Sequence, residues 1–159
     1  MKRALTAVVA IALVVTLSAC MGTPAPTYDE VHDEAVDAMK RIADTLPGGT
    51  EIDDRSRDPD ACELGSDVLL SGDGLYFTGH WVAQPGSDFD SQKFIDELPD
   101  KLGDDFLVDD TAVDVSFPAV RLRPTNSPDV LIDVAGSTPS EEPFIDILVI
   151  SRCGASPAS

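Results

Sequence analysis

The chain has 159 residues, of which 29 are acidic and 11 are Lys or Arg, so its formal net charge at pH 7 is −18. This length suits one domain with its own hydrophobic core. Such a negative charge argues against nucleic-acid binding, which needs clustered basic residues, and against adsorption of the protein surface to anionic lipid headgroups.

The first 19 residues have the pattern of an export signal. Lys2 and Arg3 precede an uncharged apolar stretch, Ala4–Leu17. A helix of this length rises about 21 Å, which is shorter than a hydrocarbon core of ~30 Å. We therefore predict a cleaved signal peptide over residues 1–19 and no stable transmembrane helix. A single arginine favours the general secretory route over the twin-arginine route.

The segment Leu17-Ser18-Ala19-Cys20 resembles the bacterial lipobox at all four positions. This resemblance implies cleavage before Cys20, a diacylglyceryl group on its nucleophilic thiol and a further acyl chain on the freed amino group. Two or more acyl chains hold a protein stably on a membrane, at about 0.8 kcal/mol per buried methylene. The alternative is an ordinary signal peptide with a chance cysteine. We expect an extracytoplasmic protein that is attached to the cell membrane through Cys20.

Residues 20–27 are small or proline-rich, and we predict that they form an extended tether. Loss of Lys2 and Arg3 with the signal peptide leaves nine basic residues against 29 acidic ones, a net charge of −20. Because anionic headgroups repel this charge, the lipid would be the whole of the membrane attachment.

A helix is predicted to start after Thr27, which forms a capping box with Glu30. The apolar stripe of this helix comprises Val31, Ala35, Ala38, Met39, Ile42 and Leu46. Pro47-Gly48-Gly49 is expected to stop the helix. The charged segment 53–60 is predicted to be a loop that leads to Cys62.

Cys62 and Cys153 remain as an even pair once Cys20 carries lipid. An exported protein meets an oxidising compartment, so we predict a Cys62–Cys153 disulfide. Closing a loop of about 90 residues would stabilise the fold by roughly 4–5 kcal/mol on the chain-entropy model. Two free thiols or metal ligands are the alternative, but the chain has no CxxC motif.

A hairpin is predicted from Val68–Leu70 and Leu75–Val82, which flank the turn Ser71-Gly72-Asp73-Gly74. Alternation should direct Leu75, Phe77, Trp81 and Ala83 to one face, and Tyr76, Thr78, His80 and Val82 to the other. His80 and Trp81 are our candidate residues for a ligand pocket. A partly exposed histidine on the second face is the alternative. A catalytic triad would need a serine and an aspartate to converge on His80, and no GxSxG motif marks such a serine.

The second half of the chain predicts a helix from about Asp90 to Leu102, which Pro99 should kink or end. Strands are then predicted at Phe106–Val108, 113–122, 130–134 and Phe144–Ile150, the last of these central in the sheet. A frayed tail is expected from Gly154. The order of these elements predicts a single α+β domain over residues 28–154, with a mostly antiparallel sheet of about five strands and two helices packed on one face. Residues 155–159 would be a disordered tail.

The order of these elements, the aromatic strand Phe77-Thr78-Gly79-His80-Trp81 and the closing Ser151-Arg152-Cys153-Gly154 are similar to the LppA-type lipoproteins of mycobacteria and their relatives. The resemblance covers most of residues 28–154. It implies the α+β fold and the disulfide, and it transfers no biochemical activity. Abundant Asp with few lysines is also typical of high-GC actinobacteria and of salt-adapted archaea, and we favour an actinobacterium.

Acidic clusters suggest calcium, and Asp58-Pro59-Asp60 near Glu63 is the best local candidate. No cluster matches the twelve-residue calcium loop, and dispersed carboxylates more often form a solvated surface. We expect no cofactor. The sequence therefore favours a non-enzymatic module that binds an envelope protein or glycan. The alternatives are a small-ligand carrier with a pocket near Trp81 and, with less support, an envelope hydrolase that uses carboxylates.

Overall fold

The computed structural model describes residues 25–57, 59–64, 72–110 and 115–157. The expected signal peptide and Cys20 lie outside these residues. The elements, in chain order, are α2 Tyr28–Ala43, β1 Glu51–Asp54, β2 Asp60–Leu64, β3 Gly72–Tyr76, β4 Thr78–Gln84, α3 Ser91–Leu102, the 3-10 turn η2 Gly103–Asp105, β5 Phe106–Val108, β6 Ala119–Pro124, β7 Leu131–Gly136, β8 Ile145–Ile150 and β9 Gly154–Ala155. None of the helices in this part of the chain is both long and apolar enough to cross a membrane.

The capping box predicted for the first helix is confirmed. The Glu30 amide donates to Thr27 Oγ1 at 3.3 Å, and the Thr27 amide donates to Glu30 Oε2 at 2.8 Å. These two bonds satisfy amides that an uncapped helix start leaves without partners. The predicted apolar stripe is buried from Val31 to Leu46. The helix itself ends at Ala43, before the predicted stop at Pro47, and Leu46 is buried from the turn that follows.

The main sheet has six strands in the order β1-β4-β8-β7-β6-β5, and every neighbouring pair is antiparallel. This confirms the predicted α+β class, with six strands in place of about five. The prediction that the strand near residues 144–150 is central is also confirmed, because β8 is third in the order. The prediction of a loop from Asp53 to Asp60 was wrong at both ends of that segment, since Asp53 and Asp54 belong to β1 and Asp60 begins β2.

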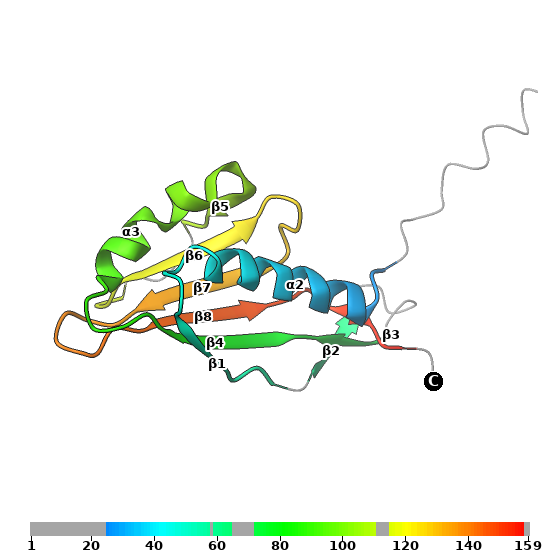
Figure 1. Cartoon of the computed structure of the whole chain (residues 1–159). Coiled ribbons are helices and arrows are strands. Elements are labelled where there is room, and N and C mark those ends of the chain that lie inside the picture. The colour runs from blue at the N-terminus through cyan, green and yellow to red at the C-terminus, as the bar shows by residue number, and fades with distance from the viewer. Residues whose placement is uncertain (1–24, 58, 65–71, 111–114, 158–159) are drawn as a thin grey trace, which may run out of the picture.

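Helices α2 and α3 cover one face of this sheet (Figure 1). Side chains alternate between buried and partly exposed along β7 and β8, as one covered face requires. The covered face and the two helices enclose one core, whose largest fully buried side chains are Met39, Ile42, Leu98, Leu122, Ile132, Ile145 and Ile147. We call the other side, which carries Thr78, His80 and Val82 of β4, the open face of the sheet.

Helix α3 begins at the predicted place, where Asp90 accepts a hydrogen bond from the Lys93 amide at 2.9 Å. The helix does not end at Pro99 but continues to Leu102, and the Gly103 amide donates to the Pro99 carbonyl. Gly103 has a φ of 62°, which glycine adopts without strain, and the helix ends before it at Leu102.

A second sheet of three strands has the order β2-β3-β9. The strand predicted over Leu75–Val82 is broken at Phe77, so that β3 joins this small sheet and β4 joins the main one. The segment Val68–Leu70 and Ser71 lie outside the described residues. The prediction that Gly72-Asp73-Gly74 form a turn was wrong, because these residues belong to β3 and pair with β2. The tail predicted to fray from Gly154 is instead ordered at its start, because Gly154 and Ala155 pair with Leu75 and Gly74.

Candidate functional site

The Cys62–Cys153 disulfide predicted from the sequence is present, with its Cα atoms 6.0 Å apart. It joins β2 to the residue that precedes β9. The first described residues enter the fold beside it, because Thr27 forms a parallel bridge with Ala155 and the Ala155 amide donates to the Pro26 carbonyl at 2.7 Å. We call this region the disulfide end of the molecule (Figure 1).

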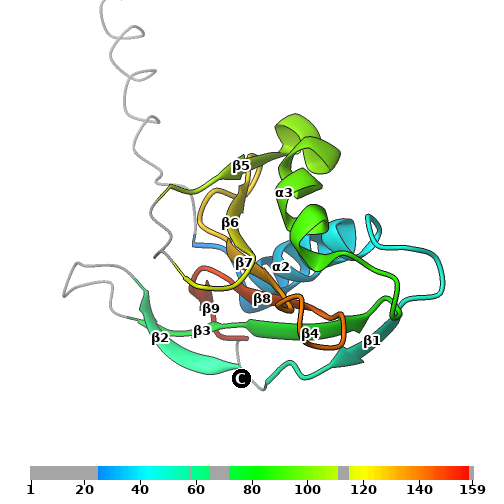
Figure 2. The ribbon, with the colours of Figure 1, turned by 90° about the vertical axis from the view of Figure 1, so that its left-hand side faces the viewer.

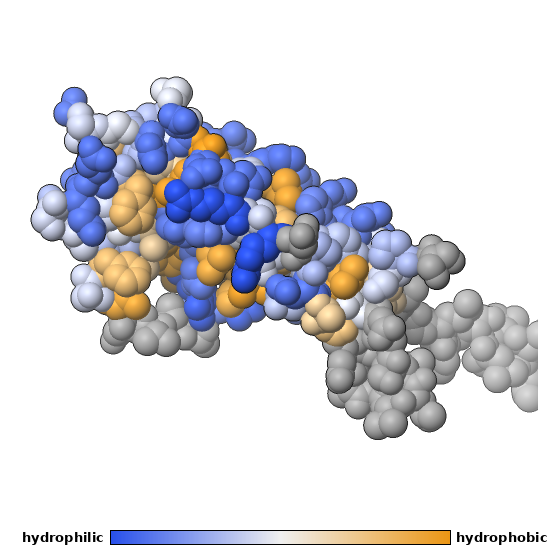
Figure 3. Space-filling model, turned by 90° about the horizontal axis from the view of Figure 1, so that it is seen from below, coloured by the Kyte–Doolittle hydropathy of each residue, from blue (hydrophilic) through white to orange (hydrophobic). Residues whose placement is uncertain are grey.

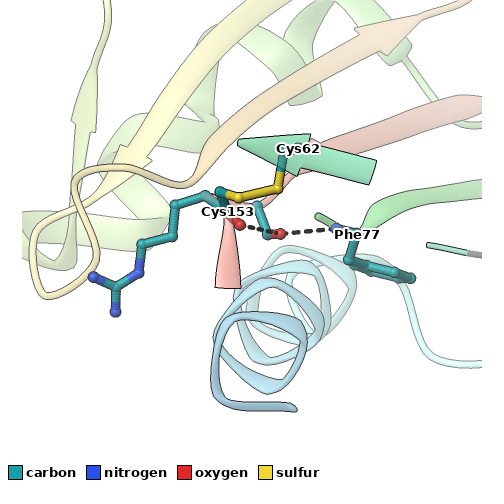
Figure 4. The surroundings of a disulfide bond; sticks show 5 residues. Cys62, Phe77 and Cys153 are labelled. Carbon is teal, nitrogen blue, oxygen red and sulfur yellow. Dashed lines mark hydrogen bonds between the residues drawn. A yellow bond between two sulfur atoms is a disulfide. The ribbon is translucent and has the colours of Figure 1, made fainter. Parts of the chain in front are cut away.

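Hydrogen bonds fix the chain that leads into the disulfide. The Phe77 amide donates to Ser151 Oγ at 2.9 Å, and this hydroxyl donates to the Arg152 carbonyl at 2.9 Å (Figure 4). The Arg152 guanidinium in turn donates to both carboxylate oxygens of Glu34 on α2, at 3.0 and 3.2 Å. The two sheets and α2 are therefore held together at this end.

His80 and Trp81, the candidate pocket residues, point to opposite faces of the main sheet. Trp81 lies opposite Ile147 on the covered face and packs against the core, whereas His80 lies opposite Leu148 on the open face. His80 Nε2 is 2.8 Å from Asp146 Oδ2 on the neighbouring strand. The two candidates therefore contact different surroundings, and no observation places them around one ligand.

A serine also approaches His80, which the sequence alone did not indicate. Ser56 Oγ accepts a hydrogen bond from the His80 backbone amide at 3.1 Å. A serine nucleophile must instead contact the imidazole ring that takes its proton. The Ser56–His80–Asp146 arrangement therefore orients the histidine, and the contact that would activate a serine is not made.

The open face also carries ion pairs that join neighbouring strands. Arg121 Nε and Nη2 donate to the two carboxylate oxygens of Asp133 at 2.6 and 2.9 Å, and this pairing raises the pKa of Arg121 despite partial desolvation. Arg123 Nε donates to Asp109 at 2.6 Å. Hydrophilic and hydrophobic residues are interspersed on the side of the molecule opposite the helices (Figure 3). Sequence reasoning missed these pairs, because only the register of the strands brings them together.

A cavity with a volume of about 810 Å³ lies between the first half of α3 and the loop that joins β7 to β8. We call it the distal groove. Its lining comprises Ser87, Asp88, Phe89, Asp90, Ser91, Gln92, Lys93, Asp96, Glu97, Ser137, Thr138, Pro139, Glu141 and Pro143. Most of these residues carry a hydroxyl, carboxylate or amide group, and Phe89, Pro139 and Pro143 add apolar surface.

The start of α3 and the loop between β7 and β8, which line the distal groove, lie at the opposite end of the sheet from β2 and β3 (Figure 1). We call the loop that joins β7 to β8, residues 137–144, the groove loop. It leads into β8 at Ile145, and the chain reaches Cys153 of the disulfide only after Ile150. At about 3.3 Å per residue, the five steps along β8 separate Ile145 from Ile150 by about 17 Å. Binding at the groove would therefore leave the disulfide end uncovered.

A ring of three hydrogen bonds forms the floor of the distal groove. The Phe144 amide donates to Ser137 Oγ at 3.3 Å, the two hydroxyls of Ser137 and Ser91 are 2.9 Å apart, and Ser91 Oγ donates to the Phe144 carbonyl at 3.3 Å. Both serines are buried. This ring connects α3 to the groove loop and so sets the width of the groove.

The rim of the groove is held by a local motif. The backbone amide and the hydroxyl of Thr138 both donate to Glu141 Oε2, at 2.9 and 2.8 Å. These bonds, the backbone one first, lower the pKa of Glu141 below its ordinary value. The Thr-x-x-Glu spacing was visible in the sequence, but the groove was not, because Ser91 and Ser137 are 46 residues apart.

In the part of the chain that the structure describes, no three His, Cys, Asp or Glu side chains gather in a group that could hold a metal ion. Asp58, which belongs to the calcium candidate of the sequence, lies outside the described residues. Comparison of this chain with protein-family models, with curated proteins and with solved structures finds no match.

Proposed function

We propose that this protein is a lipid-anchored, non-enzymatic binding module of the bacterial cell envelope, which presents its distal groove to a glycan. The lipobox at Cys20 and the resemblance to LppA-type lipoproteins support the anchor. The observation that carries the proposal is the position of the distal groove, which lies at the end of the sheet opposite the point where the chain enters the fold.

The length of the tether supports this orientation. Between Cys20 and Ala25, the first described residue, a fully extended chain spans at most about 18 Å. A lipid on Cys20 would keep the disulfide end close to the bilayer. The acidic surface is repelled by anionic headgroups, so the domain would stand on this end with its groove directed away from the membrane.

The chemistry of the groove suits a glycan better than an apolar ligand. Carboxylates and the Gln92 amide oxygen accept hydrogen bonds, and the hydroxyls of a sugar are the donors that would meet them. The ring of Phe89 is partly exposed beside these groups and offers a surface for the C–H face of a sugar. An apolar ligand would instead leave these polar groups without water or partner.

Binding to soluble fragments of cell-wall glycan tests the groove, with the full chain in mild detergent and isothermal titration calorimetry as the readout. Asp96→Ala, which removes a groove carboxylate, should weaken binding at least tenfold. Asp100→Ala is the matched control, because Asp100 is also exposed on α3 but does not line the groove. Equal loss in both variants, or no binding by the unmodified chain, would overturn the proposed ligand.

The anchor is tested separately by Cys20→Ser. This variant should accumulate as an unprocessed precursor or leave the membrane fraction, because serine lacks the nucleophilic thiol that accepts lipid. A variant that matures normally and stays in the membrane would overturn the anchor while leaving the glycan proposal intact.

A further inference from the structure

β5 forms one edge of the main sheet and β1 forms the other (Figure 2). On its inner side β5 pairs with β6, and the ladder continues beyond the strand through Asp109 N to Arg121 O and Thr125 N to Asp105 O, both at 2.9 Å. In an antiparallel ladder such bonded positions alternate along the strand. The backbone groups of residues 105, 107 and 109 therefore point toward β6, and those of residues 106 and 108 point outward.

The outward edge of β5 offers three backbone groups. The Phe106 amide, which follows the 3-10 turn η2, donates to the carbonyl of Gly103, the first residue of that turn. The groups directed along the edge are then the Phe106 carbonyl and the amide and carbonyl of Val108. An added strand could pair with these three groups without disturbing the bonds to β6.

The strand is apolar and firmly held. Phe106 is only 6% exposed, and the Arg41 guanidinium lies 4.9 Å from its ring centroid. Leu107 and Val108 are 59% and 49% exposed, and as neighbours in a strand they point to opposite faces of the sheet. An added strand would therefore find an apolar side chain on each face, on a strand that Phe106 fixes to the core.

Acidic pairs flank this apolar centre on both sides, in the sequence Asp104-Asp105-Phe106-Leu107-Val108-Asp109-Asp110. Asp105 is paired with Arg41, and Asp109 with Arg123. Asp104 and Asp110 are exposed. A second copy in antiparallel register would set Asp104 against Asp110 and Asp105 against Asp109, and like charges opposite each other disfavour pairing.

The other edge of the sheet differs. β1 reads Glu51-Ile52-Asp53-Asp54, so that acidic residues occupy the strand itself and Ile52 is its one apolar side chain. Hydrogen bonds from Ser56 lower the pKa of Asp54, which keeps this carboxylate charged. Charges within an edge strand protect it from pairing, whereas the charges around β5 lie outside its apolar centre.

We propose that the β5 edge accepts an extended segment of a partner protein, in which three apolar residues are flanked on both sides by Lys or Arg. The segment adds a seventh strand to the main sheet. Its backbone pairs with Phe106 and Val108, its apolar residues contact Leu107 and Val108, and its basic residues meet Asp104 and Asp110. This surface is separate from the distal groove and does not depend on the function proposed for it.

The probe is a labelled peptide, Arg-Lys-Val-Ile-Val-Lys-Arg, and its binding to the full chain in mild detergent is measured by fluorescence anisotropy. Val108→Pro removes the outward amide without removing a bond to β6, and it should weaken binding at least tenfold. Ile52→Pro is the matched control. The Arg55 amide donates to the His80 carbonyl, so the backbone groups of residues 55, 53 and 51 point toward β4. The Ile52 amide, between two of them, therefore points outward from the β1 edge. This control should bind as the unmodified chain does.

Unchanged binding by Val108→Pro, or an equal loss in Ile52→Pro, would overturn the proposal. If circular dichroism shows that Val108→Pro does not fold, the double variant Asp104→Lys with Asp110→Lys decides. This double variant should no longer bind the basic peptide and should instead bind the acidic peptide Glu-Asp-Val-Ile-Val-Asp-Glu. If its preference does not change in this way, the proposal is overturned as well. A dimer in sedimentation that Val108→Pro dissociates would show that a second copy occupies the edge, which contradicts the proposal as well.

Discussion

The two ends of the molecule are built by different means. The disulfide end is closed by a covalent bond, by a bridge between Thr27 and Ala155, and by close contact of backbone with backbone at Gly154. The groove end is closed by hydrogen bonds among Ser91, Ser137 and Phe144, three of them through the serine hydroxyls and one from the Ser137 amide to the Phe144 carbonyl at 3.2 Å. The end where the chain enters the fold is therefore closed covalently, while the end with the groove is closed by hydrogen bonds alone, so we expect local opening to cost less at the groove end.

The largest expected effect is loss of the disulfide. Replacing both Cys62 and Cys153 with Ala should lower the free energy of unfolding by roughly 4–5 kcal/mol, because the bond closes a loop of 91 residues in the unfolded chain. Urea denaturation of the variant and of the reduced unmodified protein should agree. A decrease below about 1 kcal/mol in both would contradict the role assigned to this end.

Alanine in place of a closely packed glycine should cost more free energy of unfolding at the disulfide end than at the groove end. At Gly154 a Cβ would lie 2.6 Å from the Thr27 carbonyl oxygen and 2.8 Å from Tyr28 Cα, so the backbone must shift. At Gly136 the nearest atom is Ser91 Cβ at 2.9 Å, with the others at 3.4 Å or more. We expect a cost of about 2–3 kcal/mol for Gly154→Ala and about 1–2 kcal/mol for Gly136→Ala in urea denaturation.

Gly48→Ala is the control for this pair, because a Cβ there meets nothing within 4 Å. Its free energy of unfolding should stay close to that of the unmodified protein. If Gly136→Ala proved more costly than Gly154→Ala, the groove end would be the more tightly packed one.

Each end of the molecule has a buried serine whose hydroxyl accepts a hydrogen bond from a backbone amide. Ser137 accepts from the Phe144 amide at the groove end, and Ser151 accepts from the Phe77 amide at the disulfide end. Alanine at either position leaves an amide without its acceptor, in buried surroundings at Phe77 and partly buried ones at Phe144, at a cost of about 1–2 kcal/mol in thermal or urea denaturation. Only Ser137→Ala should also weaken glycan binding. An equal effect of Ser151→Ala on binding would show that the ends are coupled.

The smallest effects concern two glutamates, one at each end. Hydrogen bonds from Thr27 lower the pKa of Glu30, as those from Thr138 lower that of Glu141, with the backbone bond the larger cause in both. Because each folded-state pKa lies below its value in the unfolded chain, the stabilisation is present above the ordinary pKa of 4.5 and is lost as the pH falls through the lowered value.

Titration of both carboxyls by NMR checks this prediction. Thr27→Val should raise the pKa of Glu30 only part of the way toward 4.5, since the backbone donor remains, and should leave Glu141 unchanged. Thr138→Val should do the converse. A shift of both glutamates in one variant would contradict independent ends.

Much of the fold followed from short-range patterns. The capping box at Thr27, the apolar stripe of α2, the helical segment from about Asp90 to Leu102 and the apolar run of β8 are each encoded within a few residues, so periodicity and capping rules found them. The pairing of Cys62 with Cys153 followed from there being only two cysteines besides Cys20. The short strands were harder, since β1 is acidic and β9 has only two residues. Their partners, and not their own sequences, make them strands.

The sequence by itself determined the helices and the central strand, because each depends on residue types at fixed local spacing. It also determined the disulfide, because only two cysteines besides Cys20 are present. Tertiary structure alone decided that His80 lies beside Asp146 and away from Trp81, that Ser91 meets Ser137 under a groove, and that β5 rather than β1 presents an apolar edge. These arrangements depend on strand order and register. One residue of slip would move every side chain of a strand to the other face, and the fold as a whole sets that register.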